Sequence, residues 1–216
     1  DVQNDLTVES DYSTLTINRI KGFVDVVNKS GKIKIKNVEG VQVDGMYSQI
    51  DINTVSGKSN KPIKVKSQSG RLDITDATGD LVIDNPYSTM TFKNIKGNVE
   101  LSSQSAKVSA DNITGNWNSK TLYSSLSVSG LSAQNVIISN KSNPVDVELI
   151  SKPAKVEINN EYGNVHLMLP SGFSGDVRLK ATYGSIRSDL PVEVETLAGG
   201  AIAIGKVGAG SGSLRI

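Results

Sequence analysis

The sequence predicts an all-β fold: a single-stranded parallel β-helix (β-solenoid) of about ten short coils, each 17–22 residues long. A short motif that starts with Tyr or Ser recurs at this interval along the chain. A second signal, Asn or Asp followed three residues later by Gly, falls between successive motifs. No segment shows the i, i+3, i+4 apolar stripe of a helix. A fixed period of this size is typical of a solenoid.

The first element of each coil is a short strand that follows the Tyr or Ser. In the segment Tyr87-Ser88-Thr89-Met90-Thr91-Phe92, apolar and polar residues alternate. The motif starts at Tyr12, Ser30, Tyr47, Ser69, Tyr87, Ser105, Tyr123, Ser142, Tyr162 and Tyr183. Alternation with a period of two indicates a strand with one buried face. We therefore expect these apolar residues to point inward: Leu15, Ile17, Ile33, Ile35, Ile50, Ile52, Leu72, Ile74, Met90, Phe92, Leu126 and Val128.

The second element is a glycine turn followed by another alternating strand. Asn94-Ile95-Lys96-Gly97 precedes the strand that contains Val99 and Leu101, and Asn112 to Gly115 is the same turn one coil later. Gly and Asn adopt the positive φ that tight corners need. Each coil should therefore contain two short strands and two corners.

Two other arrangements of these strands fit the pattern less well. An antiparallel hairpin meander does not require like residues to recur in every second strand, as they do here. The left-handed hexapeptide helix places apolar residues every six positions, whereas in this chain they fall at 90, 92, 95, 99 and 101. Because parallel crossovers are right-handed in nearly all cases, we expect a right-handed solenoid.

One continuous domain is expected. Residues 1–150 should form the regular coils, and residues 151–216 should continue the solenoid and cap it, because the repeat lengthens there and prolines appear. The long repeat that starts at residue 47 contains the segment from Gly57 to Pro62, which we interpret as a loop that bulges from one coil. Terminal coils must cover the apolar core and the open strand edges.

Composition excludes several functional classes. The chain has 216 residues, a net charge of +1 and no cysteine, so disulfides and thiolate metal sites are absent. It has no basic stripe with interleaved aromatic residues, and nucleic acid is not an expected partner. The lysines at 32, 34 and 36 and at 58, 61, 64 and 66 favour a solvated sheet face over a polyanion site. No signal peptide or membrane span is seen, and the abrupt start suggests a mature or expressed fragment.

Signals for catalysis are weak. His166 is the single histidine, so neither a histidine-based triad nor a multi-histidine metal site can form. Asp73 and Asp84 could both point outward on neighbouring strands as a carboxylate pair, but a chain with 22 acidic residues offers many such pairs. The glycine-rich segment from Gly205 to Gly212 lacks the phosphate-loop spacing and indicates a turn before a last strand. We predict no enzyme activity, no catalytic residue, no metal site and no cofactor.

The tyrosines are the candidate ligand-binding residues. If like positions stack, Tyr12, Tyr47, Tyr87 and Tyr123 lie on alternate coils along one edge, about 10 Å apart. The structural interpretation is a corner ring that packs over the neighbouring coil's serine, with its hydroxyl in water. The functional interpretation is an aromatic platform for a glycan or a protein partner. Trp117 replaces an aliphatic inward residue of other coils, so we expect it in the core.

The repeat, together with its C-terminal segments, resembles adhesin-like families of uncharacterised exported bacterial β-solenoid proteins, among them the head-GIN domains. The strand from Tyr162 to Pro170 is followed by another from Asp176 to Ile186, a glycine-rich stretch and a final strand. Here Tyr-Gly replaces the family's Asn-Gly turn twice. The resemblance covers essentially the whole chain. It is specific for the fold and implies no catalytic residues.

The expected function is a non-enzymatic, exported binding or scaffold module of the bacterial cell envelope, adhesin-like, and periplasmic, outer-membrane-associated or on the cell surface. Its partner would be a glycan or a cell-surface protein. Two alternatives remain open. One is a carbohydrate-active β-helix enzyme of the polysaccharide lyase or hydrolase kind. The other is a purely structural component of the envelope.

Overall fold

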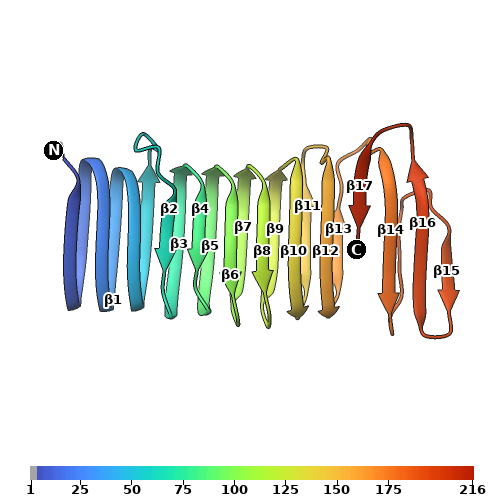
Figure 1. Ribbon diagram of the computed structural model, residues 1–216, viewed down its shortest axis with the longest axis horizontal. Coiled ribbons are helices and arrows are strands. Elements are labelled where there is room, and N and C mark those ends of the chain that lie inside the picture. The colour runs from blue at the N-terminus through green and yellow to red at the C-terminus, as the bar shows by residue number, and fades with distance from the viewer. Residues whose placement is uncertain (1–3) are drawn as a thin grey trace.

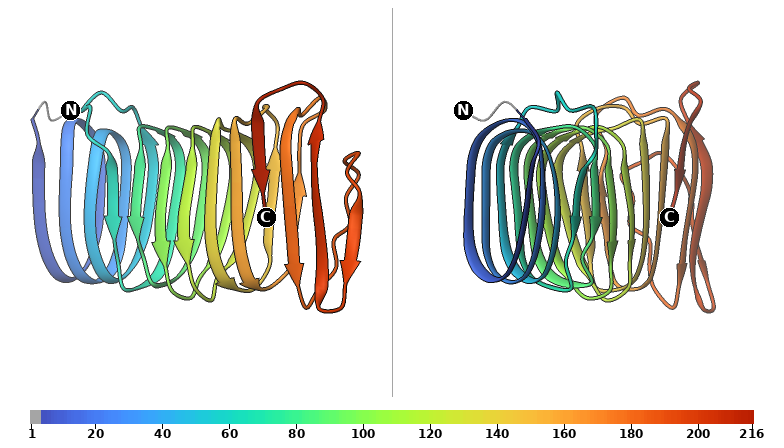
Figure 2. Two further views of the ribbon diagram at one scale, coloured as in Figure 1. Left: turned by 45° about the vertical axis from the view of Figure 1, so that its right-hand side comes forward. Right: turned by 60° about the vertical axis from the view of Figure 1, so that its left-hand side comes forward.

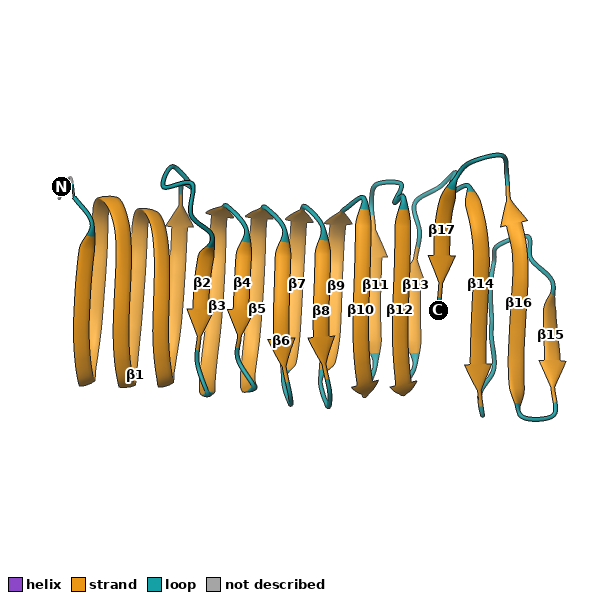
Figure 3. Ribbon diagram, viewed as in Figure 1, coloured by secondary structure: helices purple, strands orange, loops and turns teal. Residues whose placement is uncertain are grey.

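The computed structural model describes residues 4–216, and every regular element among them is a β-strand (Figure 3). Successive coils stack along the long axis of the molecule, from the N-terminal end to the C-terminal end (Figure 1). Turned views show each coil as a flattened oval (Figure 2). The predicted all-β solenoid is confirmed.

The coils form two parallel ladders of strands. The strand β1 (Leu6–Val55) winds without interruption through the first coils and pairs with both ladders. The first ladder continues through β3 (Ser69–Thr78), β5 (Tyr87–Lys96), β7 (Lys107–Thr114), β9 (Ser125–Ser132), β11 (Val145–Leu149) and β13 (Val165–Met168). The second continues through β2 (Ile63–Lys66), β4 (Leu81–Asp84), β6 (Val99–Ser103), β8 (Trp117–Thr121), β10 (Asn135–Ser142) and β12 (Lys155–Tyr162).

The register places like residues of successive motifs side by side. Tyr47 pairs with Ser69, and Ser69 pairs with Tyr87. In the same strands Ile74 lies between Ile52 and Phe92. Every inward side chain therefore packs on its own equivalents in the coils above and below, as the spacing of the motif predicted.

The core is continuous along the stack and consists of the alternating apolar residues. Eleven of the twelve residues predicted to point inward are buried, while Leu15, in the first described coil, is only partly buried against the core. Trp117 is also buried, as expected, in line with Val99 and Val136 of the neighbouring coils.

One corner of the coils up to residue 130 has a left-handed backbone conformation. Asp76, Asn94 and Asn112 occupy equivalent positions with φ between 54° and 56°. The amide of Asn94 donates to Asp76 at 2.7 Å, and that of Asn112 donates to Asn94 at 2.8 Å. The predicted Asn-containing turns thus form a hydrogen-bonded ladder along the axis.

A second corner contains buried polar side chains that the sequence interpretation did not identify. They lie at or near the end of the second-ladder strands, or directly after a motif-start tyrosine: Asn28, Ser48, Ser67, Asn85, Ser88, Ser103, Thr121, Ser124 and Asn140. Asn140, for example, donates to the carbonyl oxygen of Ser142 at 2.8 Å and accepts from Thr121 at 2.8 Å. These bonds satisfy polar groups of Asn140 and Thr121 that would otherwise be costly to bury, whereas Asn28 Oδ1 is buried without a hydrogen-bond partner.

The C-terminal part extends the second ladder by a different topology. β14 (Gly175–Thr182) pairs antiparallel with β16 (Gly200–Val207), which pairs antiparallel with β15 (Val194–Leu197). The last strand, β17 (Gly212–Arg215), lies between β12 and β14 and is parallel to both. We call β14 to β17 and their connections the cap.

The parallel stack has fewer coils than the ten that the sequence predicted, because the last motif lies in the cap. The motif at Tyr183 does not begin a further coil, because Tyr183 follows the end of β14, whose partners are β16 and β17. The parallel stack therefore has fewer coils than the motif has copies. The connection between β14 and β15 covers the end of the core with the partly buried side chains of Ile186, Leu190 and Val192.

Candidate functional site

The tyrosines form an exposed row along one edge of the stack. We call the motif-start residues from Tyr12 to Tyr162 the tyrosine edge: tyrosine at 12, 47, 87, 123 and 162, and serine at 30, 69, 105 and 142. The register places tyrosine and serine on alternate coils, as predicted, with Tyr123 bridged in parallel to Ser142. The five tyrosines are 55–80% exposed.

The tyrosine rings are exposed because each lies at a corner of its coil, with its side chain directed away from the core. The hydroxyl of Tyr87 donates to the side-chain carbonyl of Gln104 at 2.6 Å, which ties the ring to the next coil. More than half of that side chain still faces solvent. The structure thus has features of both interpretations of the tyrosines, a corner residue and an exposed platform, and tests neither.

Apolar residues precede the three tyrosines in the middle of the row, whereas acidic residues precede Tyr12 and Tyr162. Met46 precedes Tyr47 and is 36% exposed, and Leu122 precedes Tyr123 and is 40% exposed. On the intervening coils the preceding residue is Gln68 or Gln104 in the middle of the row, and Lys29 or Lys141 nearer its ends. The middle of the edge therefore alternates between coils that present an aromatic and an apolar side chain and coils that present hydrogen-bonding side chains.

A shallow hollow lies against Tyr87. Its volume is about 470 Å³, it is open to solvent, and Tyr87, Ser105 and Lys107 are among the residues that line it. Aromatic, hydroxyl and ammonium groups from two neighbouring coils therefore face the same space. Such a surface suits a ligand rich in hydroxyl groups that lies along the edge.

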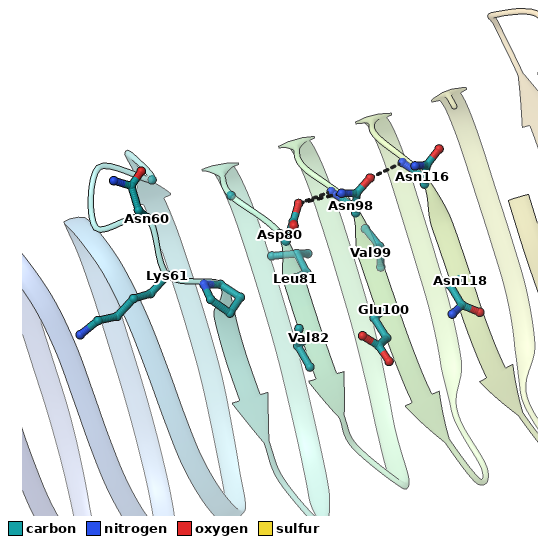
Figure 4. A pocket seen from close by; sticks show the side chains of 13 residues that line it. Asn60, Lys61, Asp80, Leu81, Val82, Asn98, Val99, Glu100, Asn116 and Asn118 are labelled. Carbon is teal, nitrogen blue, oxygen red and sulfur yellow. Dashed lines mark hydrogen bonds between the residues drawn. The ribbon is translucent and has the colours of Figure 1, made fainter. Parts of the chain in front are cut away.

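A second hollow lies over the second ladder, below the loop from Gly57 to Pro62 (Figure 4). Its volume is about 570 Å³ and it is also open to solvent. The carboxylate of Asp80 accepts from the backbone N–H of Asn98 at 2.8 Å, and the side-chain oxygen of Asn98 accepts from the N–H of Asn116 at 2.9 Å. These groups hold successive coils together, so we interpret this hollow mainly as a consequence of the bulging loop.

The comparisons with known proteins identify a family. The sequence profile of the Toastrack DUF4097 family matches residues 54–202, more than half of the chain. The chain belongs to the Toastrack DUF4097 family. The resemblance to a β-solenoid family is thereby confirmed, but the match gives neither the adhesin nor the head-GIN name. No curated protein and no solved structure matches the sequence.

The Toastrack chain does not bring together the acids that the sequence suggested as a pair. Asp73 lies in β3, in the first ladder, and Asp84 lies in β4, in the second ladder. The register instead places Asp73 beside Asp51 across β1 and β3. Arg71 Nε donates to Asp73 Oδ2 at 2.6 Å, and this contact raises the pKa of Arg71 above its ordinary value.

The remaining residues of interest lie apart from one another. His166 is in β13, where its exposed ring nitrogen Nδ1 is 3.8 Å from a carboxylate oxygen of Asp146. Among residues 4–216 no group of three or more His, Asp or Glu side chains is arranged to hold a metal ion. The same part of the chain includes no helix of the length and apolarity needed to cross a membrane. The glycine-rich segment forms the end of β16 and the turn before β17, as expected.

Proposed function

We propose that this Toastrack domain is a non-enzymatic binding module, an exported and adhesin-like component of the bacterial cell envelope. The observation that supports the proposal is the tyrosine edge. Five exposed tyrosines lie in register on alternate coils, and the core between them is filled by apolar side chains. An extended row of rings provides contact area without a deep pocket.

The geometry favours a long ligand over a small one. Alternate coils repeat at about 10 Å, since neighbouring strands lie about 4.8 Å apart. A linear glycan can contact several rings of such a row at once, and several weak contacts then add up to a useful affinity. A glycan is accordingly the proposed partner, and a cell-surface protein with an extended segment is the other candidate partner.

A binding screen with paired variants tests the proposal. The purified domain is screened against an array of bacterial and host glycans, and bound glycans are then titrated by calorimetry. Tyr87→Ala and Tyr123→Ala should each weaken binding by about 1–3 kcal/mol, the usual cost of losing an aromatic anchor. Their thermal stability should change little, because both side chains are more than half exposed.

Tyr183→Ala is the matched control. Tyr183 is 94% exposed but lies in the cap, outside the tyrosine edge, so its loss should leave binding unchanged. Equal affinities of Tyr87→Ala, Tyr123→Ala and the parent domain would assign these tyrosines a structural role only. The absence of catalysis is tested separately, by incubation with polysaccharides and measurement of reducing ends. Turnover that Asp73→Asn abolishes would establish the enzyme alternative.

A further inference from the structure

We propose that the tyrosine edge binds a linear acidic polysaccharide in which an acidic group occurs on every second sugar. This inference rests on the binding role proposed above and names the class of ligand. It comes from a second row of side chains, two residues after each motif start, which points to the same face as the tyrosines because strand side chains alternate. We call these residues the adjacent row.

The adjacent row alternates in charge with the same two-coil period as the tyrosines. Its members are Thr14, Lys32, Gln49, Arg71, Thr89, Lys107, Ser125, Pro144 and Asn164, and the alternation extends from Thr14 to Ser125. The strand register pairs Gln49 with Arg71, Arg71 with Thr89, Thr89 with Lys107 and Lys107 with Ser125. From Thr14 to Ser125, cations therefore lie on the coils whose motif begins with serine, and neutral residues lie on the coils whose motif begins with tyrosine; Pro144, on the Ser142 coil, ends this alternation.

The result is a checkerboard of rings and positive charges. Along the axis Tyr12, Tyr47 and Tyr87 are each followed, one coil later and two residues further along the strand, by a cation, whereas Tyr123 is followed by Pro144. Tyr87 and Lys107 line the same hollow, so at this point both elements face one space. A polymer that lies along the edge meets a stacking surface and a positive charge in turn.

The charge spacing distinguishes an acidic polysaccharide from a nucleic acid. Cations of the adjacent row recur about every 10 Å, two strand spacings. A nucleic acid strand has one phosphate per about 3.4 Å, so most of its charges would have no partner here. A polysaccharide with one carboxylate per disaccharide has sparse charges and hydroxyl groups between them, which the serines and glutamines of the intervening coils can bind.

Acidic residues limit which part of the edge is suitable. Asp51 and Asp73 point to the same face two residues beyond the adjacent row, and Asp73 accepts a hydrogen bond from Arg71. That contact uses one of the five N–H donors of the arginine. The equivalent positions in the next three coils are Thr91, Ser109 and Ser127, all neutral. The segment from Tyr87 through Lys107 to Tyr123 is therefore the centre of the proposed site.

Hyaluronan and chitin oligosaccharides of equal length are the probes. Hyaluronan has one carboxylate per disaccharide and chitin has no charge. We expect the domain to bind hyaluronan more tightly, with an affinity that falls as salt is added. Lys107→Gln should weaken hyaluronan binding about two- to fivefold, as for one exposed ion pair, and leave chitin binding unchanged. Lys107→Glu should weaken hyaluronan binding further.

Lys96→Gln is the matched control, because Lys96 is an exposed lysine at the far end of β5 and should not affect either probe. Equal binding of both probes with no effect of Lys107→Gln would overturn the acidic preference, and loss of both in Tyr87→Ala would still support the tyrosine edge. Tighter binding of oligothymidylate than of hyaluronan would also overturn the inference in favour of a nucleic acid. If neither polysaccharide binds, the inference is wrong, and the glycan array decides the proposed function by itself.

Discussion

The parallel stack and the C-terminal cap bury similar aliphatic side chains but depend on contacts of different range. In the stack, each residue pairs with its equivalent 17–22 residues away, as Ile74 does with Ile52 and Phe92. In the cap, Leu214 of β17 pairs with Val156 of β12 and with Val177 of β14, which precede it by much longer stretches of chain. A repeated local rule builds the stack, and a specific long-range arrangement builds the cap.

This difference affects what a single substitution does. A residue inside the stack supports two neighbouring coils, whereas a residue on the outer face of the cap supports few contacts. Ile74→Ala should lower the free energy of unfolding by about 2–4 kcal/mol, because Ile74 is fully buried. Ile204→Ala, at a side chain that is 60% exposed in β16, should change it by less than about 0.5 kcal/mol. Chemical denaturation measures the free energy of unfolding of both variants. Equal losses would contradict the proposed difference between a position inside the stack and one on the outer face of the cap.

Glycines give a second comparison of the two regions. Gly115 has a φ of 145°, and a Cβ there would overlap the carbonyl group of Gly97 in the preceding coil. Gly115→Ala should therefore cost about 1–3 kcal/mol in strain. Gly199, in the cap, has open space where a Cβ would be, so Gly199→Ala is the control and should be nearly neutral. Thermal unfolding of the two variants separates them, and a neutral Gly115→Ala would mean that coils can shift to make room.

The smallest expected effect is on the pKa of Glu157, which lies where β12 of the stack pairs with β17 of the cap. Glu157 of β12 is 2.7 Å from Lys155 and pairs in register with Arg215 of β17. The hydrogen bond and the charge of Lys155, and more weakly the charge of Arg215, lower the pKa of Glu157 below its ordinary value. Since the folded state has the lower pKa, this contribution to stability is present above the ordinary value and is lost as the pH falls through the lowered pKa.

Carboxyl-group NMR titration tests this order. Lys155→Gln should raise the pKa of Glu157 towards its ordinary value more than Arg215→Gln does, because the hydrogen bond is the largest cause. A larger rise of the Glu157 pKa in Arg215→Gln would show that Arg215 of β17, and not Lys155 of β12, has the greater effect on the Glu157 carboxylate.

The stack could be predicted from the sequence because its rule is local and repeated. Ile33, Met90 and Val128 were assigned to the core from alternation and period alone. Leu15 was also assigned to the core but is only partly buried, because it lies near the end of the stack, where only one side is covered. The antiparallel pairing of β14 with β16 could not be predicted, since antiparallel and parallel strands show the same alternation of period two.

Only part of the candidate site follows from the sequence. The row of tyrosines was predicted from its spacing, and the structure places those side chains on the surface in that order. The alternating charge of Lys32, Arg71 and Lys107 lies at a fixed offset from the motif start, so the sequence contains it, but its place beside the tyrosines depends on how neighbouring coils pair. The separation of Asp73 from Asp84 also depends on pairing, because it reflects which strands share a ladder.

The position of β17 has a consequence for the order of folding. β17 follows β14, β15 and β16 in the chain, yet it lies between β12 and β14. Until residues 212–215 have been synthesised, β12 and β14 each lack one of their two strand partners and expose an unpaired edge to other chains. The coils from β1 to β12 can form progressively as the chain lengthens, since each needs only the preceding coil. Closure of the cap is therefore a late step in folding. A chain in which this step is interrupted would be a folded solenoid with unpaired strand edges at one end, which can pair with other chains.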